Sequence, residues 1–189
     1  MVKTDIATSD SQFEQILSLQ QQYSQQVLTP RQQQSEGFVF LQHTLPLLKK
    51  MAAKLPQAIA LQENQIVGYC LSLSLSLQSS FPRLEPMFDQ FTYCRYREKR
   101  LADYCFFVGG QVCVDRDFRG QGISSRLYNH IRRTLSAQYE LCVTEVSTRN
   151  QASVHAHKKM GFETILTYSD DNEQWKILAW NLQNASRKK

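Results

Sequence analysis

VCVDRDFRGQGISSRL, the stretch at residues 112–127, decides how this chain is expected to fold. Its first residues are largely apolar and β-branched, as in a buried strand. From Ile123 to Leu135 apolar residues recur at steps of four, which is the spacing of an amphipathic helix. Gly120 and Gly122 stand in the polar turn between the two. The stretch therefore predicts a strand, a glycine turn and a helix whose first turn begins near Gly122.

A helix start of this kind is a candidate anion site. Its first amide groups have no partner within the helix and, with the positive end of the helix dipole, they bind phosphate oxygens. The two glycines remove the Cβ atoms that would hold a bulky anion away from the main chain, and Arg116, Arg119 and Arg126 are near enough to add charge. A glycine turn that merely starts a helix remains the alternative.

Two other phosphate-binding motifs do not fit this stretch. A P-loop needs a lysine after its last glycine, but Gly122 is followed by Ile123 and Ser124. A dinucleotide-binding fingerprint has its third glycine replaced by Ser125, and its turn should follow the strand at once. Here the five residues 115–119 intervene. Neither nucleotide fold is therefore expected.

Strands and helices alternate along the C-terminal half of the chain. Alternation of this kind predicts a sheet covered by helices, with parallel strand pairs wherever a helix intervenes. A late hairpin around residues 170–173 adds an antiparallel margin. The expected elements are a strand at 104–115, a helix at 123–137, a strand at 140–148, a helix at 151–160 and strands at 162–168 and 173–182.

The N-terminal part is expected to begin with a short strand over 2–7 and a helix from about Ser9. Residues 29–37, which hold a proline, predict a loop, and residues 38–55 predict a second helix that ends before Pro56.

Residues 58–77 predict a hairpin, because polar residues divide two apolar runs. The second run alternates leucine and serine, so the four leucines from Leu71 to Leu77 are expected to face the core. The segment 79–101 is longer than most connections and is therefore either partly helical or functional.

Composition suits one globular domain of 189 residues, 42% of them hydrophobic and 21% charged. No apolar run reaches the roughly 18 residues of a membrane span and no signal-peptide block opens the chain, so a cytoplasmic protein without a membrane partner is expected. Five cysteines, an odd number without close pairs, favour buried free thiols over disulfides or a metal site. The net charge of +5, part of it from the tail at 187–189, does not choose between phosphate and nucleic acid.

The stretch at 112–127, followed by a strand and then by NQASVHAHKKMGF, resembles the GCN5-related N-acetyltransferase superfamily. The pyrophosphate motif of that family is Q or R, two residues, G, one residue, then G or A. It falls here on Arg119, Gly122 and Ser124, where the serine is a mild departure.

The second signature of that superfamily is an asparagine, a small residue three positions later and a terminal GF. It falls on Asn150, Ser153, Gly161 and Phe162, and the resemblance extends over about 56–182.

The resemblance implies a fold and a domain plan. The fold is α/β: a mixed, mostly antiparallel sheet of six to seven strands, with helices on both faces and a V-shaped splay between two central parallel strands that end near Val114 and Ser147. The whole chain, 1–189, is then a single domain. Its parts are an N-terminal strand and helices at 1–55, a motif-bearing sheet and helices at 56–182, and a basic tail at 183–189.

The resemblance also implies acetyl-CoA as cosubstrate, without a metal. The main chain of Val112 and Val114 would pair with the pantetheine arm, the amides of 121–125 would hold the pyrophosphate, and Asn150 would contact the arm from the other side. From the residues alone, Asn150 is equally well placed to cap the following helix. The implied cofactor-binding residues are Val112, Val114, Arg119, Gly120, Gln121, Gly122, Ile123, Ser124, Ser125, Asn150 and Ser153.

Direct acetyl transfer to a primary amine needs a proton acceptor, and a proton donor for the departing thiolate. Many members carry a tyrosine four residues before the glycine of GF, where this chain has His157. An imidazole can donate a proton, although a surface or inert histidine remains open. Glu145, an acid inside an apolar strand, is the first candidate base; Asp103, Tyr104 and Asp115 are weaker candidates.

The expected partners are acetyl-CoA and an amine of a small molecule or a protein. A homodimer is left open and nucleic acid is disfavoured. The alternative function is a catalytically silent CoA-binding or nucleic-acid-associated regulatory module on the same fold, because His157 stands in the usual tyrosine position. Cys113 and Cys142 are interpreted as core residues.

Overall fold

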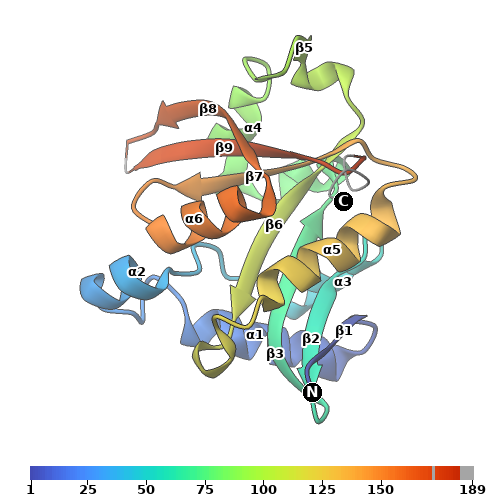
Figure 1. The fold of residues 1–189 in the computed structure, drawn as a ribbon, viewed down its shortest axis with the longest axis vertical. Helices are drawn as coiled ribbons and strands as arrows, with labels where there is room; N and C mark the ends of the chain where they lie inside the picture. Colours follow the sequence, from blue (N-terminus) through green and yellow to red (C-terminus); the bar gives the residue numbers. More distant parts are fainter. Residues whose placement is uncertain (172, 184–189) are drawn as a thin grey trace.

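The computed structural model describes residues 1–171 and 173–183, so residues 184–189 of the expected basic tail lie outside the described residues. A seven-stranded sheet in the order β1-β2-β3-β6-β7-β9-β8 forms its centre (Figure 1). All neighbouring strands are antiparallel except β6 and β7, which confirms the expected fold class. The strands are β1 Lys3–Ile6, β2 Ala58–Gln62, β3 Gln65–Leu73, β6 Phe106–Val114, β7 Leu141–Ser147, β8 Glu163–Ser169 and β9 Gln174–Asn181.

The two parallel strands separate soon after they pair. They match over only three positions, beginning with Phe106 opposite Leu141. Where they part, the Thr144 hydroxyl donates a hydrogen bond to the Gly109 carbonyl oxygen at 2.7 Å. Beyond that point β6 keeps only β3 as a partner, and β7 keeps only β9. The predicted V-shaped splay between the ends of β6 and β7 is therefore present.

Helices cover both faces of the sheet, and a buried apolar cluster lies under each face. Helix α5 packs on β2 and β3 from one side, α1 packs on β3 and α3, and α2 lies against α6 (Figure 1). Helix α1 begins at Asp10, where the sequence predicts it, and Ser9 caps it in a capping box with Gln12. The helices are α1 Asp10–Gln22, α2 Pro30–Glu36, α3 Leu45–Ala52, α4 Glu85–Gln90, α5 Ile123–Leu135 and α6 Gln151–Met160.

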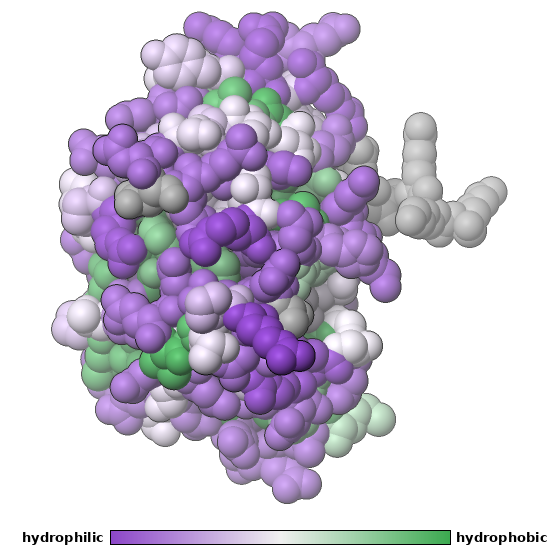
Figure 2. Space-filling view, turned by 90° about the vertical axis from the view of Figure 1, so that its left-hand side faces the viewer, coloured by the Kyte–Doolittle hydropathy of each residue, from purple (hydrophilic) through white to green (hydrophobic). Residues whose placement is uncertain are grey.

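Polar residues cover most of the face that carries α2 and α6, and apolar residues show between them only in small groups (Figure 2). Among the described residues, no helix is both long and apolar enough to cross a membrane.

The prediction of a loop at 29–37 is wrong, because these residues hold the short helix α2. The Thr29 hydroxyl accepts a hydrogen bond from the Gln32 backbone amide, and the Gln32 side-chain oxygen accepts one from the Thr29 backbone amide. Pro30 suits the first turn. Helix α1 has already ended at Gln22, so Pro30 does not end a helix but starts one.

The predicted helix at 38–55 is too long. Residues 38–44 are not helical, and the Val39 amide donates to the Tyr23 carbonyl oxygen at 2.8 Å, which ties this segment to the end of α1. Thr44 then caps α3, with Pro46 in its first turn. The segment 38–44 thereby runs beside the splay instead of joining the helical layer.

The leucine–serine alternation is not a strand to its end. Strand β3 stops at Leu73, and Leu75–Ser80 form a 3₁₀ helix that Ser74 caps. Near the end of β3, the side chain of Gln57 takes the place of a neighbouring strand, since its amide group bonds both the N–H and the C=O of Ser72. Leu77 is buried as expected, but Leu75 is exposed.

The segment 79–101 is partly helical, one of its two expected alternatives. It contains a 3₁₀ turn, helix α4 and a small hairpin of β4 Arg95–Tyr96 with β5 Lys99–Arg100. Four cysteines are buried free thiols, as predicted, but Cys105 is exposed.

Candidate functional site

The glycine turn opens α5 with its backbone exposed. Gly120 and Gly122 have φ angles of +76° and +71°, a left-handed conformation that side chains disfavour. A Cβ atom at either position would meet no atom within 4 Å, so the space beside the turn is open. The first backbone bond of the helix runs from the Arg126 amide to the Gly122 carbonyl oxygen. The amides of 123–125 are therefore donors without a helical partner.

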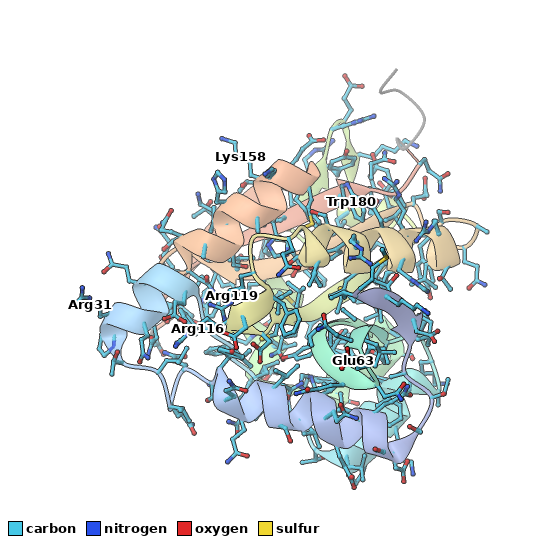
Figure 3. All side chains as sticks on the ribbon, turned by 60° about the horizontal axis from the view of Figure 1, so that its bottom comes forward. Arg31, Glu63, Arg116, Arg119, Lys158 and Trp180 are labelled. Carbon is cyan, nitrogen blue, oxygen red and sulfur yellow. The ribbon has the colours of Figure 1, made fainter. Side chains whose placement is uncertain are left out.

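The arginines near this turn are bound to the protein. Arg116 and Arg119 lie close to each other (Figure 3). Arg116 pairs with Glu36 at 2.7 Å, and Arg119 contacts the same carboxylate at 3.3 Å. Arg119 also donates from Nε to the Val114 carbonyl oxygen at 3.0 Å. Arg126 bonds a carbonyl at the chain start. The amides, more than these guanidinium groups, are the uncommitted donors of the turn.

A groove runs from this turn towards the splay, with β6 on one side and α6 on the other; we call it the turn groove. It brings together the side chains of all the sequence-predicted binding residues except Gln121, which is exposed outside it. The groove also has walls that the sequence did not reveal, such as Glu36 of α2 and Tyr23 of α1. Its predicted members are Val112, Val114, Arg119, Gly120, Gly122, Ile123, Ser124, Ser125, Asn150, Ser153 and His157.

Asn150 joins α6 to the N-terminal segment. Its Oδ1 accepts from the Ser153 amide at 3.1 Å, which is the helix cap that its sequence position predicts. Its Nδ2 donates to the Phe38 carbonyl oxygen at 3.3 Å. A Cβ at Gly37 would lie 2.8 Å from Oδ1, so only glycine allows this close approach. Asn150 therefore holds residues 37–38 across the splay.

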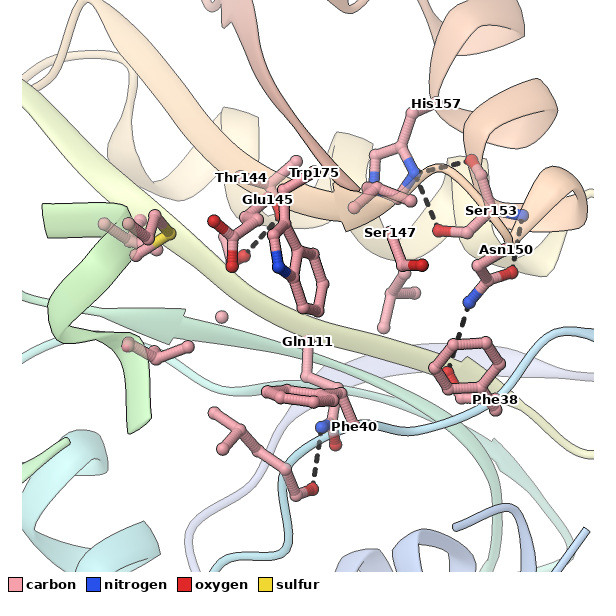
Figure 4. A pocket seen from close by; sticks show the side chains of 18 of the residues that line it. Phe38, Phe40, Gln111, Thr144, Glu145, Ser147, Asn150, Ser153, His157 and Trp175 are labelled. Atoms are coloured by element: carbon pink, nitrogen blue, oxygen red, sulfur yellow. Dashed lines mark hydrogen bonds between the residues drawn. The ribbon is translucent and has the colours of Figure 1, made fainter. Parts of the chain in front are cut away.

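A second cavity, which we call the carboxylate chamber, lies on the far side of this crossing (Figure 4). Phe38, Val112, Asn150, Ser153 and His157 line both the chamber and the turn groove, so the two spaces adjoin. The other lining residues of the chamber do not line the turn groove; they are Phe40, Leu41, Leu84, Met87, Val108, Gly109, Gly110, Gln111, Tyr128, Thr144, Glu145, Val146, Ser147 and Trp175.

Glu145 provides the carboxylate of the chamber from the middle of β7. Burial raises its pKa to about 7, against the opposing effect of a hydrogen bond from the Tyr168 hydroxyl. That bond goes to Oε2, and within the described residues Oε1 has no hydrogen-bond partner. Tyr168 stands on β8, whose sequence gave no sign that it would reach this acid.

His157 is buried, so the interpretation as a surface histidine is wrong. Its Nδ1 lies 2.8 Å from the Ser153 carbonyl oxygen, which can only accept, so Nδ1 carries the hydrogen. Nε2 then accepts from the Tyr128 hydroxyl at 2.9 Å. Burial lowers the pKa of His157, which keeps the ring neutral at neutral pH. Tyr128, on α5, was not singled out in the sequence because a tyrosine at helical spacing is usually a core residue.

The weaker candidates lie outside the chamber. Asp103 pairs with Arg100, the Tyr104 hydroxyl donates to a backbone carbonyl, and Asp115 caps a 3₁₀ turn. Burial raises the pKa of Cys113 to about 12, so its thiol stays protonated although it lines the turn groove. In the part of the chain that the structure describes, no three histidine, cysteine, aspartate or glutamate residues gather as metal ligands.

The comparisons with known proteins agree with this geometry. The sequence profile of the Acetyltransferase (GNAT) family matches residues 15–162. No curated protein matches the chain.

Solved structures share the fold at low sequence identity. The ribosomal-protein-S18-alanine N-acetyltransferase from Escherichia coli is 12% identical, with a TM-score of 0.63 over 100% of this chain and 99% of that one. An N-acetyltransferase from Staphylococcus aureus is 16% identical, with a TM-score of 0.62 over 97% and 99%. A Salmonella typhimurium protein, described as an acetyltransferase and determined with its cofactor acetyl-CoA, is 11% identical, with a TM-score of 0.63 over 100% and 98%.

Proposed function

The chain belongs to the acetyltransferase (GNAT) family, and on that premise we propose that it transfers an acetyl group from acetyl-CoA directly to a primary amine. One observation carries the proposal: a glycine turn, whose first amides have no partner within the helix, opens on a groove that adjoins a chamber holding a half-buried carboxylate. Acetyl-CoA, when bound, supplies the acetyl group as a thioester. The whole chain, 1–189, acts as one domain.

The turn groove fits such a cosubstrate. The open space beside Gly120 and Gly122 gives a pyrophosphate access to the main chain, and the amides of 121–125 donate to its oxygens. Beyond Val108, β6 has no partner on the side of β7, so the main chain of Val112 and Val114 lies on an unpaired edge that an extended arm can follow. Asn150 and Ser153 form the opposite wall, and Arg119 braces the turn.

Glu145 is the base. Above about pH 7 its carboxylate is ionised and accepts the proton that the amine loses. The accepting atom is Oε1, which has no hydrogen-bond partner among the described residues. Gly110 lines the chamber at a bulge in the register of β3 and β6, so its amide is outside the strand ladder. That amide stabilises the negative charge that develops on the carbonyl oxygen during attack.

His157 and Tyr128 supply the returning proton as a pair. As negative charge builds on the departing sulfur, the Tyr128 hydroxyl gives its proton to the sulfur and takes another from Nε2 of His157, which accepts a proton from solvent in the same step. The amine proton stays on Glu145 and leaves to solvent afterwards. The hydroxyl is thus never left as a phenolate, which its burial opposes by raising the pKa of Tyr128 well above the ordinary value. His157 lines both cavities, so the pair stands where the thioester would lie.

Release of free CoA thiol from acetyl-CoA in the presence of a panel of primary amines tests the proposal. Amine-dependent release is expected. The engagement of both ring nitrogens of His157 favours one competing function, a silent CoA-binding module. If the chain binds CoA but releases no thiol from acetyl-CoA with any amine, that alternative is established and the transferase is rejected.

A further inference from the structure

The lining of the carboxylate chamber carries an inference about the acceptor, which rests on the proposed function. We propose that the acceptor is a monoamine whose nitrogen is attached to a compact apolar group, aromatic or branched aliphatic, without a second charge or a set of hydroxyls nearby.

Apolar side chains from three separate parts of the chain form the walls. The rings of Phe40 and Trp175 meet edge to face, with centroids 5.1 Å apart (Figure 4). Leu84 and Met87, from the segment around α4, are buried and line the same space. Walls of this kind are stabilised by apolar surface on a ligand, because that surface leaves water on binding.

The polar side chains of the chamber are already hydrogen-bonded within the protein. Gln111 donates to the Leu41 carbonyl oxygen at 2.9 Å and accepts from the Tyr69 hydroxyl at 2.7 Å. The hydroxyls of Thr144 and Ser147 donate to Gly109 and Glu173. Asn150, Ser153, His157 and Tyr128 bond one another or the backbone as described above.

Glu145 Oε1 is the exception among these lining side chains. One carboxylate matches one ammonium group. A polyamine would bring a second charge into an apolar space without a partner, and an amino sugar would bring hydroxyls without partners; both lose their hydration without replacement.

An arginine that contacts Phe40, without lining the chamber itself, acts in the same direction. The exposed guanidinium group of Arg83 lies 4.4 Å from the ring centroid of Phe40. Its positive charge repels a second ammonium group that lies near this ring.

The experiment compares kcat/KM of the full chain with acetyl-CoA and 2-phenylethylamine, isobutylamine, spermidine and glucosamine. We expect the two apolar amines to exceed the two polar ones by at least about 50-fold, the scale on which enzymes reject groups that are left unpaired. Two peptides that begin with leucine or aspartate distinguish the sources of the apolar group: if the leucine peptide exceeds phenylethylamine, the group belongs to a polypeptide N-terminus.

Phe40→Ala tests the wall itself. It is expected to lower the ratio of kcat/KM for phenylethylamine over ethylamine about tenfold, because only the larger amine reaches the ring. The matched control is Tyr93→Ala, which removes an exposed aromatic ring that lines neither cavity. It should leave the ratio unchanged.

Preference for spermidine or glucosamine, or an equal effect of Phe40→Ala on both amines, would overturn this inference and leave the proposed transferase standing. Absence of turnover with every amine, while acetyl-CoA still binds, would instead reject the transferase and the acceptor class together.

Discussion

The hydroxyl of Tyr128 lies 2.9 Å from Nε2 of His157, and both side chains are buried between α5, α6 and the splay of the sheet. The other ring nitrogen is held 2.8 Å from the Ser153 carbonyl oxygen. The histidine is therefore fixed in one orientation and one tautomer, with its reactive nitrogen occupied by a phenol from a different helix. One hydrogen bond thus joins two residues that lie 29 positions apart in sequence.

Removing the Tyr128 hydroxyl should lower kcat. Tyr128→Phe keeps the ring packed against Phe162 and Trp180, and kcat is expected to fall about 100-fold with KM for both substrates nearly constant. His157→Phe should have a similar effect, and the double variant should lose no more than either single one, because the two act together. Steady-state kinetics of the three variants checks this; kcat of Tyr128→Phe within threefold of wild type would refute the pair.

Tyr128→Phe should also cost stability. It leaves Nε2 of His157 buried without its hydrogen-bond donor, for which about 1–3 kcal/mol is typical. Urea unfolding measures this loss of stability. Kinetics measured where both proteins are fully folded then show the effect on kcat alone.

Glu145 should set the pH dependence of the reaction. Its pKa of about 7 means that the carboxyl group is protonated and inactive below that pH and ionised above it, so kcat/KM is expected to rise as pH increases through about 7. Glu145→Gln should lower kcat/KM by about 10²–10⁴ and remove this limb of the profile. The control is the affinity of Glu145→Gln for CoA, measured by calorimetry, which should equal that of the wild type. A limb that persists in the variant would remove Glu145 from the role of base.

A negative charge at the glycine turn should weaken cofactor binding. Gly122→Asp places a carboxylate in the open space beside the turn, and the Kd for CoA is expected to rise about 100-fold, or about 2.7 kcal/mol. Gly122→Asn is the matched control, because it has the same size and also tolerates positive φ without the charge. Equal Kd values for the two variants would argue against an anion at this position.

Substitution of two adjacent glycines of β6 by alanine should affect the stability of the fold differently. A Cβ at Gly109 would lie 3.0 Å from the Cys142 sulfur and 3.4 Å from the Tyr128 hydroxyl, so Gly109→Ala is expected to destabilise the fold by about 1–3 kcal/mol. At Gly110 the nearest atom would be 3.6 Å away, an ordinary contact. Gly110→Ala should therefore be neutral or stabilise by up to about 1 kcal/mol. The urea midpoints of the two variants test this prediction. Equal losses of stability would show that the splay is not tightly packed at Gly109.

The sequence predicted the C-terminal half closely because its signals are local. The periodicity from Ile123, the turn at Gly122 and the cap Asn150 each fix an element by nearest-neighbour chemistry, and α5 and α6 begin where these residues place them. The expectation that strands joined by a helix pair in parallel is correct for β6 and β7, which enclose the splay. It is wrong for β7 and β8, because β9 lies between them and pairs antiparallel with both.

The N-terminal half needed tertiary contacts that a pattern does not carry. At the end of β3, beyond its pairing with β2, the side-chain amide of Gln57, 15 residues earlier, bonds both backbone groups of Ser72. Residues 38–44 stay extended because Val39 pairs with the end of α1. Neither partner can be read from the local pattern around the residue that it fixes.

The site was predicted in part for the same reason. Glu145 was found as a charge within an apolar strand, and the groove residues were found by their motif. Phe40, Trp175, Tyr128 and Tyr168 were missed, because aromatic residues on helices and strands look like core until the fold brings them to a cavity.

The most direct test of the account is an NMR titration of the ¹⁵N-labelled chain with CoA, followed by the same titration with adenosine, which lacks the pyrophosphate. We predict that CoA shifts the amide resonances of residues 121–125 and the side-chain amide of Asn150 more than any others, and that adenosine leaves 121–125 nearly unmoved. Saturating CoA without shifts at 121–125, or equal shifts there with adenosine, would contradict the claim that these main-chain amides bind the pyrophosphate.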